Sequence, residues 1–166
     1  MPNFWIERSA PGRLAIIPRP RGGDWLADEI HLLRRDGIDV IVSLLTQDER
    51  EELGLAEEER ACVDAGISYR NLAIEDRSIP TSHNGVQNLI EELSALLKEG
   101  KAIGIHCRGS IGRSSLLAAC LLVHEGIDCG EALRRIRSAR GCEVPETESQ
   151  RMWIEKYAAS QRTARQ

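Results

Sequence analysis

Short apolar segments that suit β-strands alternate with longer amphipathic segments along most of this sequence. Two of them, residues 3–7 and 13–17, flank a Pro-Gly turn and predict an N-terminal β-hairpin. Residues 38–45 are almost continuously apolar and predict a buried strand, and residues 67–74 and 101–105 predict two more. Strands that alternate with helices indicate an α/β fold, in which a central, mostly parallel sheet has helices on both faces.

The segments between the predicted strands carry helix signals. The clearest signal lies at residues 86–97, where apolar residues recur at helical spacing. Three capping boxes, Thr46 with Glu49, Asp128 with Glu131 and Thr147 with Gln150, mark the starts of three more helices, of which the second covers residues 131–140. Further helices are expected over residues 25–35, 56–65 and 114–125.

The length of the chain suits one globular unit. Its 166 residues can form one core of ordinary size, so we expect a single domain over residues 1–160. Residues 161–166 follow the last apolar positions and are expected to form a disordered tail.

The charge and the cysteine content of the sequence limit the partners and cofactors that the protein is expected to bind. The sequence has 22 Lys+Arg against 26 Asp+Glu, so it lacks the positive field that attracts nucleic acid or acidic membranes. Its five cysteines are far apart and form no C-x-x-C pair, so neither a metal site nor a redox dithiol is expected. Because the sequence shows no secretory leader and no long apolar segment, we expect a cytoplasmic protein with reduced thiols. The sequence does not reveal the oligomeric state, and a monomer is taken as the default.

One polar segment, HCRGSIGRSS at residues 106–115, joins a predicted buried strand to a predicted buried helix. A loop in this position can turn successive backbone N–H groups inward, and the helix N-terminus adds partial positive charge. Both effects favour a thiolate at Cys107, while Arg113 offers a planar fork that suits two phosphate oxygens. The segment therefore predicts attack by sulfur on phosphorus. The alternative, an inert buried cysteine near a solvated arginine, leaves this combination of residues unexplained.

This segment resembles the signature loop of the cysteine-dependent protein tyrosine phosphatase superfamily, H-C-x-x-G-x-x-R-S/T, particularly in its small dual-specificity branch. The segments IVSLLTQDEREELGL, EDRSIP and VPETESQ are similar to those of bacterial relatives of the cyclin-dependent-kinase-inhibitor-associated phosphatases, so the resemblance covers roughly residues 10–158. It implies a phosphocysteine intermediate on Cys107 and a phosphate-binding loop made by Arg108, Gly109, Ser110, Ile111, Gly112 and Arg113.

The signature contains one departure, because Ser110 stands where the family has glycine. If this position requires a positive φ, serine adds strain of about 1 kcal/mol. The neighbouring Gly109 and Gly112 can relieve part of that strain.

A general acid is also expected, because an alkoxide or phenolate leaves faster when it is protonated. Asp76 begins the segment D-x-x-x-P, which ends at Pro80 and resembles the family's acid loop D-x-G-x-P, with Ser78 in place of the glycine. Chemistry alone accepts Glu75 equally well, so the preference for Asp76 comes from the resemblance. The structural alternative for Asp76 is a residue that caps local N–H groups of a turn.

Three more residues have supporting roles to test. Gln150 falls where the similar proteins place the glutamine that orients the hydrolytic water, but it is equally explained as part of its capping box. Ser114 can donate a hydrogen bond to the departing thiolate, cap its helix, or do both. His106 belongs to the signature and is expected to fix the loop by bonding to backbone.

We expect a phosphatase that needs neither a metal nor a cofactor. Its expected substrate is phosphotyrosine in proteins, and the resemblance implies phosphoserine and phosphothreonine as additional substrates. One alternative is a phosphatase of a non-protein phosphate ester, although loop positions 108–112 carry only one cation. A second is a catalytically weak phosphopeptide-binding module, because two family glycines are serine here. A third is a rhodanese-like sulfur transferase, which needs neither Asp76 nor Arg113.

Overall fold

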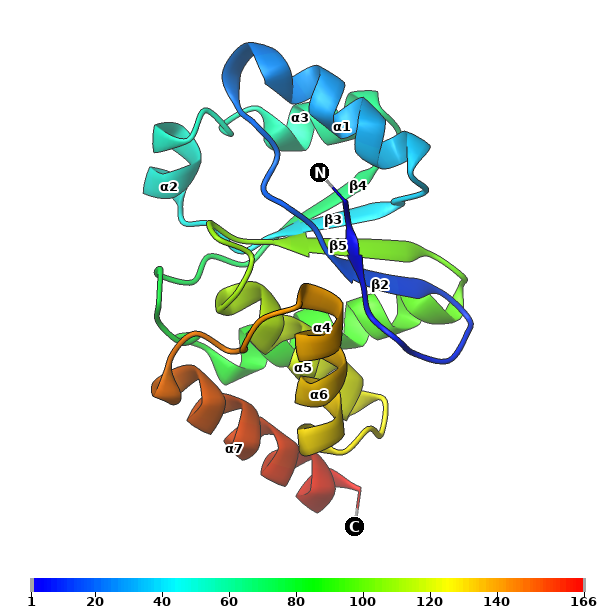
Figure 1. Ribbon diagram of the computed structural model, residues 1–166, viewed down its shortest axis with the longest axis vertical. Coiled ribbons are helices and arrows are strands. Elements are labelled where there is room, and N and C mark those ends of the chain that lie inside the picture. Colours follow the sequence, from blue (N-terminus) through cyan, green and yellow to red (C-terminus); the bar gives the residue numbers. More distant parts are fainter. Residues whose placement is uncertain (1, 166) are drawn as a thin grey trace.

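A five-stranded sheet with the strand order β1-β2-β5-β3-β4 forms the centre of the protein (Figure 1). The computed structural model describes residues 2–165. β1 pairs antiparallel with β2, and the pairs β2–β5, β5–β3 and β3–β4 are parallel. The predicted hairpin and mostly parallel sheet are confirmed. The strands are β1 (Phe4–Trp5), β2 (Arg13–Ile16), β3 (Val40–Ser43), β4 (Ser68–Asn71) and β5 (Ala102–His106).

The two central strands are covered on both faces. Every residue of β3 and β5 is buried, whereas β4 at the edge has only exposed and half-buried positions. The apolar sequence of β3 fits this place, since a parallel strand covered on both faces has no side that meets water. Because β3 and β5 run in the same direction, the loops that follow them leave the sheet at the same edge.

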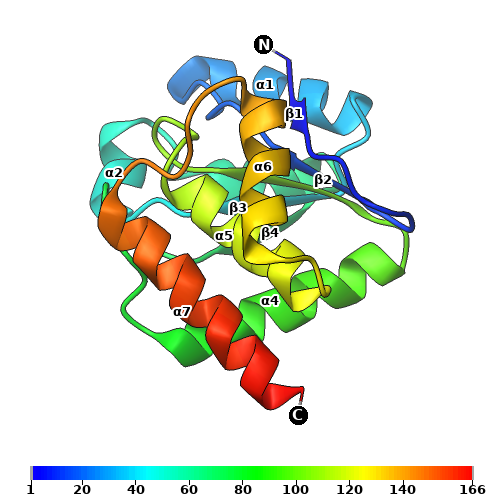
Figure 2. The same cartoon turned by 60° about the horizontal axis from the view of Figure 1, so that its bottom comes forward.

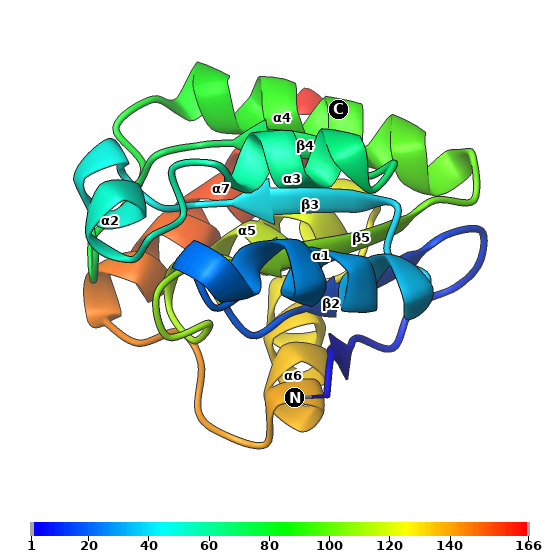
Figure 3. The ribbon, with the colours of Figure 1, turned by 90° about the horizontal axis from the view of Figure 1, so that it is seen from above.

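Helices lie on both faces of the sheet, as predicted (Figures 1 and 3). α1 and α3 cover one face through a core that includes Leu26, Ile30 and Cys62. α4, α5, α6 and α7 cover the other face with a larger core. A short 3-10 turn over Gly23–Trp25 precedes α1. The helices are α1 (Leu26–Arg35), α2 (Gln47–Glu52), α3 (Glu58–Asp64), α4 (His83–Lys98), α5 (Arg113–His124), α6 (Cys129–Arg140) and α7 (Glu148–Ala164).

α5 is the centre of the larger helical layer. It is buried at every residue from Arg113 to Val123, and α4, α6 and α7 pack around it (Figure 2). A helix enclosed on all sides is expected to be apolar, which the LLAACLLV segment satisfies. Arg113 and Ser114 in its first turn are exceptions, and buried polar groups of this kind need partners. None of the helices within residues 2–165 has the length and apolar character to cross a membrane.

Two of the three predicted capping boxes are confirmed. The side chains of Thr46 and Thr147 accept hydrogen bonds from the backbone N–H groups of Glu49 and Gln150. The side chains of Glu49 and Gln150 in turn accept hydrogen bonds from the backbone N–H groups of the two threonines. These boxes fix the first turns of α2 and α7, which both border the site described below.

The box predicted for Asp128 with Glu131 is wrong. Asp128 caps α6 through the backbone N–H of Gly130, and the Glu131 carboxylate binds Arg134 and Arg135 instead.

The chain end differs from its prediction. α7 continues to Ala164, so residues 161–164 are helical and not part of a disordered tail. Gln161 is buried and hydrogen-bonds with His124 and Gln87. These partners lie far away in sequence, which is why local hydrophobicity did not reveal them. Gln166, the last residue of the predicted tail, lies outside the described residues.

Replacing Leu121 by alanine is expected to lower the free energy of unfolding by about 2–5 kcal/mol, because this fully buried leucine would leave a cavity among close-packed neighbours. Urea denaturation followed by circular dichroism measures the difference. Val63 is 66% exposed, so Val63→Ala is the control and should change the free energy by less than about 0.5 kcal/mol. Equal effects at the two positions would contradict the central place of α5.

Candidate active site

The loop of residues 107–112 joins β5 to α5 at the carboxyl end of the central parallel strands (Figure 1). Ligands of open α/β sheets bind at this edge. The segments after β3 and β4 reach the same place, because residues of both hydrogen-bond with Arg113 at the start of α5. The start of α7 also borders this loop, since a Cβ on Gly112 would lie 2.8 Å from Oε1 of Gln150. Four segments far apart in the sequence therefore meet here.

Cys107 is the first residue after β5 and is 2% exposed. The hydroxyl of Ser114, in the first turn of α5, donates a hydrogen bond to its sulfur at 2.9 Å. A hydroxyl that donates to sulfur stabilises the thiolate more than the thiol. Two roles were left open for Ser114: a hydrogen bond to the sulfur and a cap on its helix. The hydrogen bond to the sulfur is present, whereas no side chain caps the start of α5 in the described part of the chain.

The backbone of the loop is oriented by two arginines that lie outside it. The carbonyl of Arg108 accepts a hydrogen bond from Arg19 at 3.2 Å, and the carbonyl of Ser110 accepts one from Arg140 at 2.7 Å. In a trans peptide the N–H points opposite to the C=O. The N–H groups of Gly109 and Ile111 are therefore directed to the side away from these arginines, as a cradle for an anion requires.

Ser110 has a φ of 55°, so the positive φ considered for this position is present. A serine is strained there. Its hydroxyl donates a hydrogen bond to the carbonyl of Ile17 at 2.8 Å, and the residue is buried. Glycine could not make this bond, so the replacement adds an anchor between the loop and the end of β2.

Arg113 is 1% exposed and is held mainly by Glu49. The Nη1 and Nη2 atoms donate to the two carboxylate oxygens of Glu49 at 2.6 and 2.9 Å, a bidentate pair. Nη1 also donates to the carbonyl of Ile74 at 2.7 Å. Within residues 2–165, Nε of Arg113 donates to no other group.

The pKa values of this pair follow from its geometry. Burial alone would lower the pKa of Arg113, but the hydrogen bonds to Glu49 and the charges of Cys107 and Glu49 outweigh it and raise the pKa. Burial alone would raise the pKa of Glu49, but the hydrogen bonds from Arg113 and Thr46 outweigh it and lower the pKa. Both groups are therefore charged at neutral pH.

Sequence reasoning assigned Glu49 only to a capping box and missed this second role. Its Oε1 accepts from both the backbone N–H of Thr46 and Nη1 of Arg113. One signal could have revealed it: Glu49 follows a buried parallel strand that neighbours β5, so it emerges at the same edge as Cys107.

Asp76 lies beside Arg113, whereas Glu75 does not. Oδ1 of Asp76 is 3.1 Å from Nη2 of Arg113, and half of the Asp76 side chain is exposed. Glu75 is exposed and its side chain makes no hydrogen bond within the described part of the chain. Of the two carboxylates that the sequence left open, Asp76 is the one at the loop.

Gln150 links α7 to the segment that carries Asp76. Its Oε1 accepts from the backbone N–H of Thr147 at 3.2 Å, which is the predicted cap, and its Nε2 donates to the carbonyl of Ser78 at 3.0 Å. Arg77 and Glu146 form an ion pair at 2.6 Å between the same two segments. Gln150 thus has the structural role expected of it and also lies against Gly112 of the loop over residues 107–112.

His106 is fully buried and pairs with Glu58 of α3, which sequence reasoning did not single out. Nε2 of His106 is 2.7 Å from Oε2 of Glu58, and Nδ1 is 3.4 Å from the carbonyl oxygen of Cys107. The imidazole therefore bridges α3 and the backbone of Cys107. This contact with backbone is the one expected for His106.

Two groups of known proteins are similar in sequence to parts of this chain. Cyclin-dependent kinase inhibitor 3 of Rattus norvegicus is 35% identical over 71 residues, which cover 42% of this chain and 34% of the relative. Protein tyrosine phosphatase domain-containing protein 1 of Mus musculus is 26% identical over 119 residues, which cover 65% of this chain and 16% of the relative. The matched part is therefore a third of these relatives' length or less.

Solved structures share the fold. Kinase associated phosphatase, in a crystal structure with serine in place of its catalytic-site cysteine, is 23% identical, with a TM-score of 0.80 over 90% of this chain and 88% of that chain. Tk-PTP in its active form is 22% identical, with a TM-score of 0.75 over 94% of this chain and 97% of that chain. A protein-family model described as "Polymorphic toxin system, DSP-PTPase phosphatase" matches residues 17–127, well over half of the sequence. The chain therefore belongs to this DSP-PTPase phosphatase family, within the cysteine-dependent protein tyrosine phosphatase superfamily.

Proposed function

We propose that this protein hydrolyses phosphate monoesters of proteins, phosphotyrosine first and phosphoserine or phosphothreonine in addition, through a phosphocysteine intermediate on Cys107. The proposal rests on one arrangement of side chains and backbone. The hydroxyl of Ser114 donates a hydrogen bond to the sulfur of Cys107, the loop that follows turns two amides to one side, and Arg113 binds the carboxylates of Glu49 and Asp76. Family membership supports the same chemistry.

In the first step the sulfur of Cys107 attacks phosphorus, so that an S–P bond forms while the ester P–O bond breaks. Asp76 gives its proton to the leaving oxygen. The free Nε of Arg113 and the amides of the loop bind the oxygens of the phosphoryl group. The position of Asp76 beside Arg113 supports this role, since it lies 3.1 Å from the group that would hold the phosphate.

In the second step water attacks phosphorus, the S–P bond breaks, and Asp76 accepts the proton of the water. Ser114, which already donates to the sulfur, stabilises the departing thiolate. Gln150 is proposed to position the water, because its amide lies against Gly112 of the loop. His106 is a positioning residue for the backbone of Cys107.

Glu49 is proposed as a positioning residue for Arg113. Two hydrogen bonds from the same carboxylate restrain the guanidinium plane, so little reorganisation is needed when an anion arrives. A carboxylate also limits the positive charge of the site.

The alternatives are less well supported by the contacts. Arg108, the one cation at loop positions 108–112, forms an ion pair with Glu52 at 3.2 Å, which weakens the case for a multiply phosphorylated non-protein ester. The binding-module alternative relied on distortion by serine, but Ser110 is anchored by its own hydroxyl. We further propose a monomeric protein in the cytoplasm, a compartment in which its five free cysteines would stay reduced.

Cys107→Ser is expected to abolish hydrolysis of an aryl phosphate in the presence of EDTA, because serine at this position is not ionised. Asp76→Ala is expected to lower kcat by about 10²–10⁴-fold. The matched control is Glu75→Ala, which should keep activity near that of the parent protein. Steady-state kinetics with phenyl phosphate measure all three. A larger loss at Glu75 than at Asp76 would refute the assignment of the acid.

Glu49→Gln is expected to reduce both turnover and stability, with a pH dependence set by the lowered pKa of Glu49. The ionised carboxylate stabilises the fold fully above its ordinary pKa near 4.5, and this contribution is lost as pH falls through the lower folded value. The difference in unfolding free energy between parent and variant should therefore be constant from pH 7 to 5 and shrink below it. Urea titrations at several pH values test this. A difference that grows on acidification would contradict the ion pair.

A further inference from the structure

Asp76 lies at the tip of a tight turn in the segment that joins β4 to α4. The backbone N–H of Ser78 donates a hydrogen bond to the carbonyl of Glu75 at 3.0 Å, so Asp76 and Arg77 are the two central residues of the turn. Arg77 has a φ of 59°, a left-handed conformation that favours glycine at this position of a turn. A non-glycine residue keeps such a conformation only where contacts from its surroundings maintain it.

The side chains of these two central residues bind different parts of the protein. Oδ1 of Asp76 accepts a hydrogen bond from Nη2 of Arg113, at the start of α5, at 3.1 Å. Nη1 of Arg77 donates to Oε1 of Glu146, just before α7, at 2.6 Å. The tip of the turn is therefore restrained by two consecutive side chains with separate partners.

Glu146 also contacts the loop of residues 107–112. A Cβ on Gly112 would lie 2.9 Å from Oε2 of Glu146, so this oxygen lies against the loop while Oε1 binds Arg77. The backbone N–H of Glu146 donates to Oε1 of Gln150 at 3.1 Å, which ties Glu146 to the first turn of α7. One carboxylate thus joins the turn to the phosphate-binding loop of the proposed mechanism.

The two ion pairs at the tip differ in what the reaction does to them. To act as an acid, Asp76 must carry a proton, and a protonated carboxyl group has no charge with which to pair with Arg113. Arg77 and Glu146 stay charged at that stage, because neither takes part in the proton transfer. Of the two pairs, the one between Arg77 and Glu146 is therefore the one that persists when the acid is needed.

We propose that Arg77 and Glu146 are positioning residues for Asp76, and that their ion pair holds the protonated carboxyl group of Asp76 at the leaving oxygen of the ester. This proposal rests on the phosphatase function proposed above, with Asp76 as its acid. Both partners of the pair are partly exposed, so the expected effect of breaking it is modest.

The test compares kcat/KM for phenyl phosphate and dinitrophenyl phosphate in each variant. Phenolate needs a proton to leave quickly, whereas dinitrophenolate is stable without one, so the ratio of the two kcat/KM values reports protonation by Asp76. This ratio, phenyl over dinitrophenyl, is expected to fall about fivefold in Arg77→Gln and in Glu146→Gln. A merely structural loss would lower both kcat/KM values and leave the ratio unchanged. Added NaCl should lower the ratio more in the parent protein than in either variant, because the pair is exposed to solvent.

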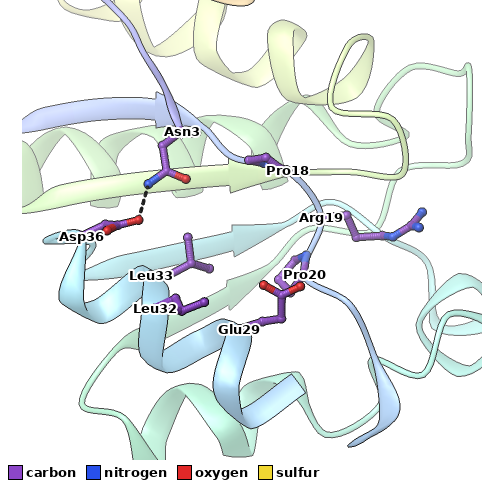
Figure 4. Close-up of a pocket in the computed structure, with 8 residues that line it drawn as sticks. All are labelled: Asn3, Pro18, Arg19, Pro20, Glu29, Leu32, Leu33 and Asp36. Atoms are coloured by element: carbon purple, nitrogen blue, oxygen red, sulfur yellow. Dashed lines mark hydrogen bonds between the residues drawn. The ribbon is translucent and has the colours of Figure 1, made fainter. Parts of the chain in front are cut away.

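The matched control is Arg21→Gln, which should keep the parent ratio. Arg21 pairs with Glu29 of α1 at 2.6 Å, and its side chain is 63% exposed, against 62% for Arg77. Figure 4 shows Glu29 in a cavity of about 230 Å³, beside Pro20 of the segment after β2. The residues that line this cavity include none from the turn at Asp76 or from the start of α7.

A second arm tests whether Arg77 acts through Asp76. Asp76→Ala should lower the ratio more than Arg77→Gln does, and adding Arg77→Gln to Asp76→Ala should not lower it further. A parent ratio in Arg77→Gln, an equal fall in Arg21→Gln, or a further fall in the double variant would overturn the proposal. Hydrolysis of both esters by the parent protein but not by Cys107→Ser establishes the phosphatase function separately. An unchanged ratio in Asp76→Ala would refute the assignment of the acid and the proposal with it.

Discussion

The bidentate pair between Arg113 and Glu49 is the interaction on which the site depends. It joins the start of α5, at the centre of the larger core, to α2, which follows a neighbouring parallel strand. A guanidinium buried to this degree would be unstable without such a partner. The same group reaches the carbonyl of Ile74 and the carboxylate of Asp76, so one side chain sets the positions of three segments around the loop.

Residues outside the loop fix the orientation of its backbone. Arg19 and Arg140 bind the carbonyls of residues 108 and 110, and the hydroxyl of Ser110 binds the carbonyl of Ile17. With these two carbonyls bonded to the arginines, the amides of Gly109 and Ile111 point to the opposite side of the loop. The proposed nucleophile, its cradle and the proposed acid therefore come from different elements but share one network.

The sequence predicted what depends on local patterns and missed what depends on packing. The parallel sheet, the hairpin, two of the three capping boxes and the loop at the carboxyl edge follow from periodicity and short motifs. Glu49 was hidden because its capping box explained it completely, and Glu58 because it stands in an acidic run that is typical of a solvated helix. The positive φ at Ser110 could be anticipated from the signature, but its bond to Ile17 required the position of β2.

In the proposed mechanism the sulfur of Cys107 carries the phosphoryl group during turnover. Rapid acid quenching of the protein during hydrolysis of an aryl phosphate with a good leaving group, followed by digestion and mass spectrometry, detects such an intermediate directly. We expect one phosphoryl group on the peptide that contains Cys107, appearing before free phosphate reaches its steady rate. Turnover with an unmodified Cys107 peptide at every quench time, or with the phosphoryl group on another residue, would contradict it.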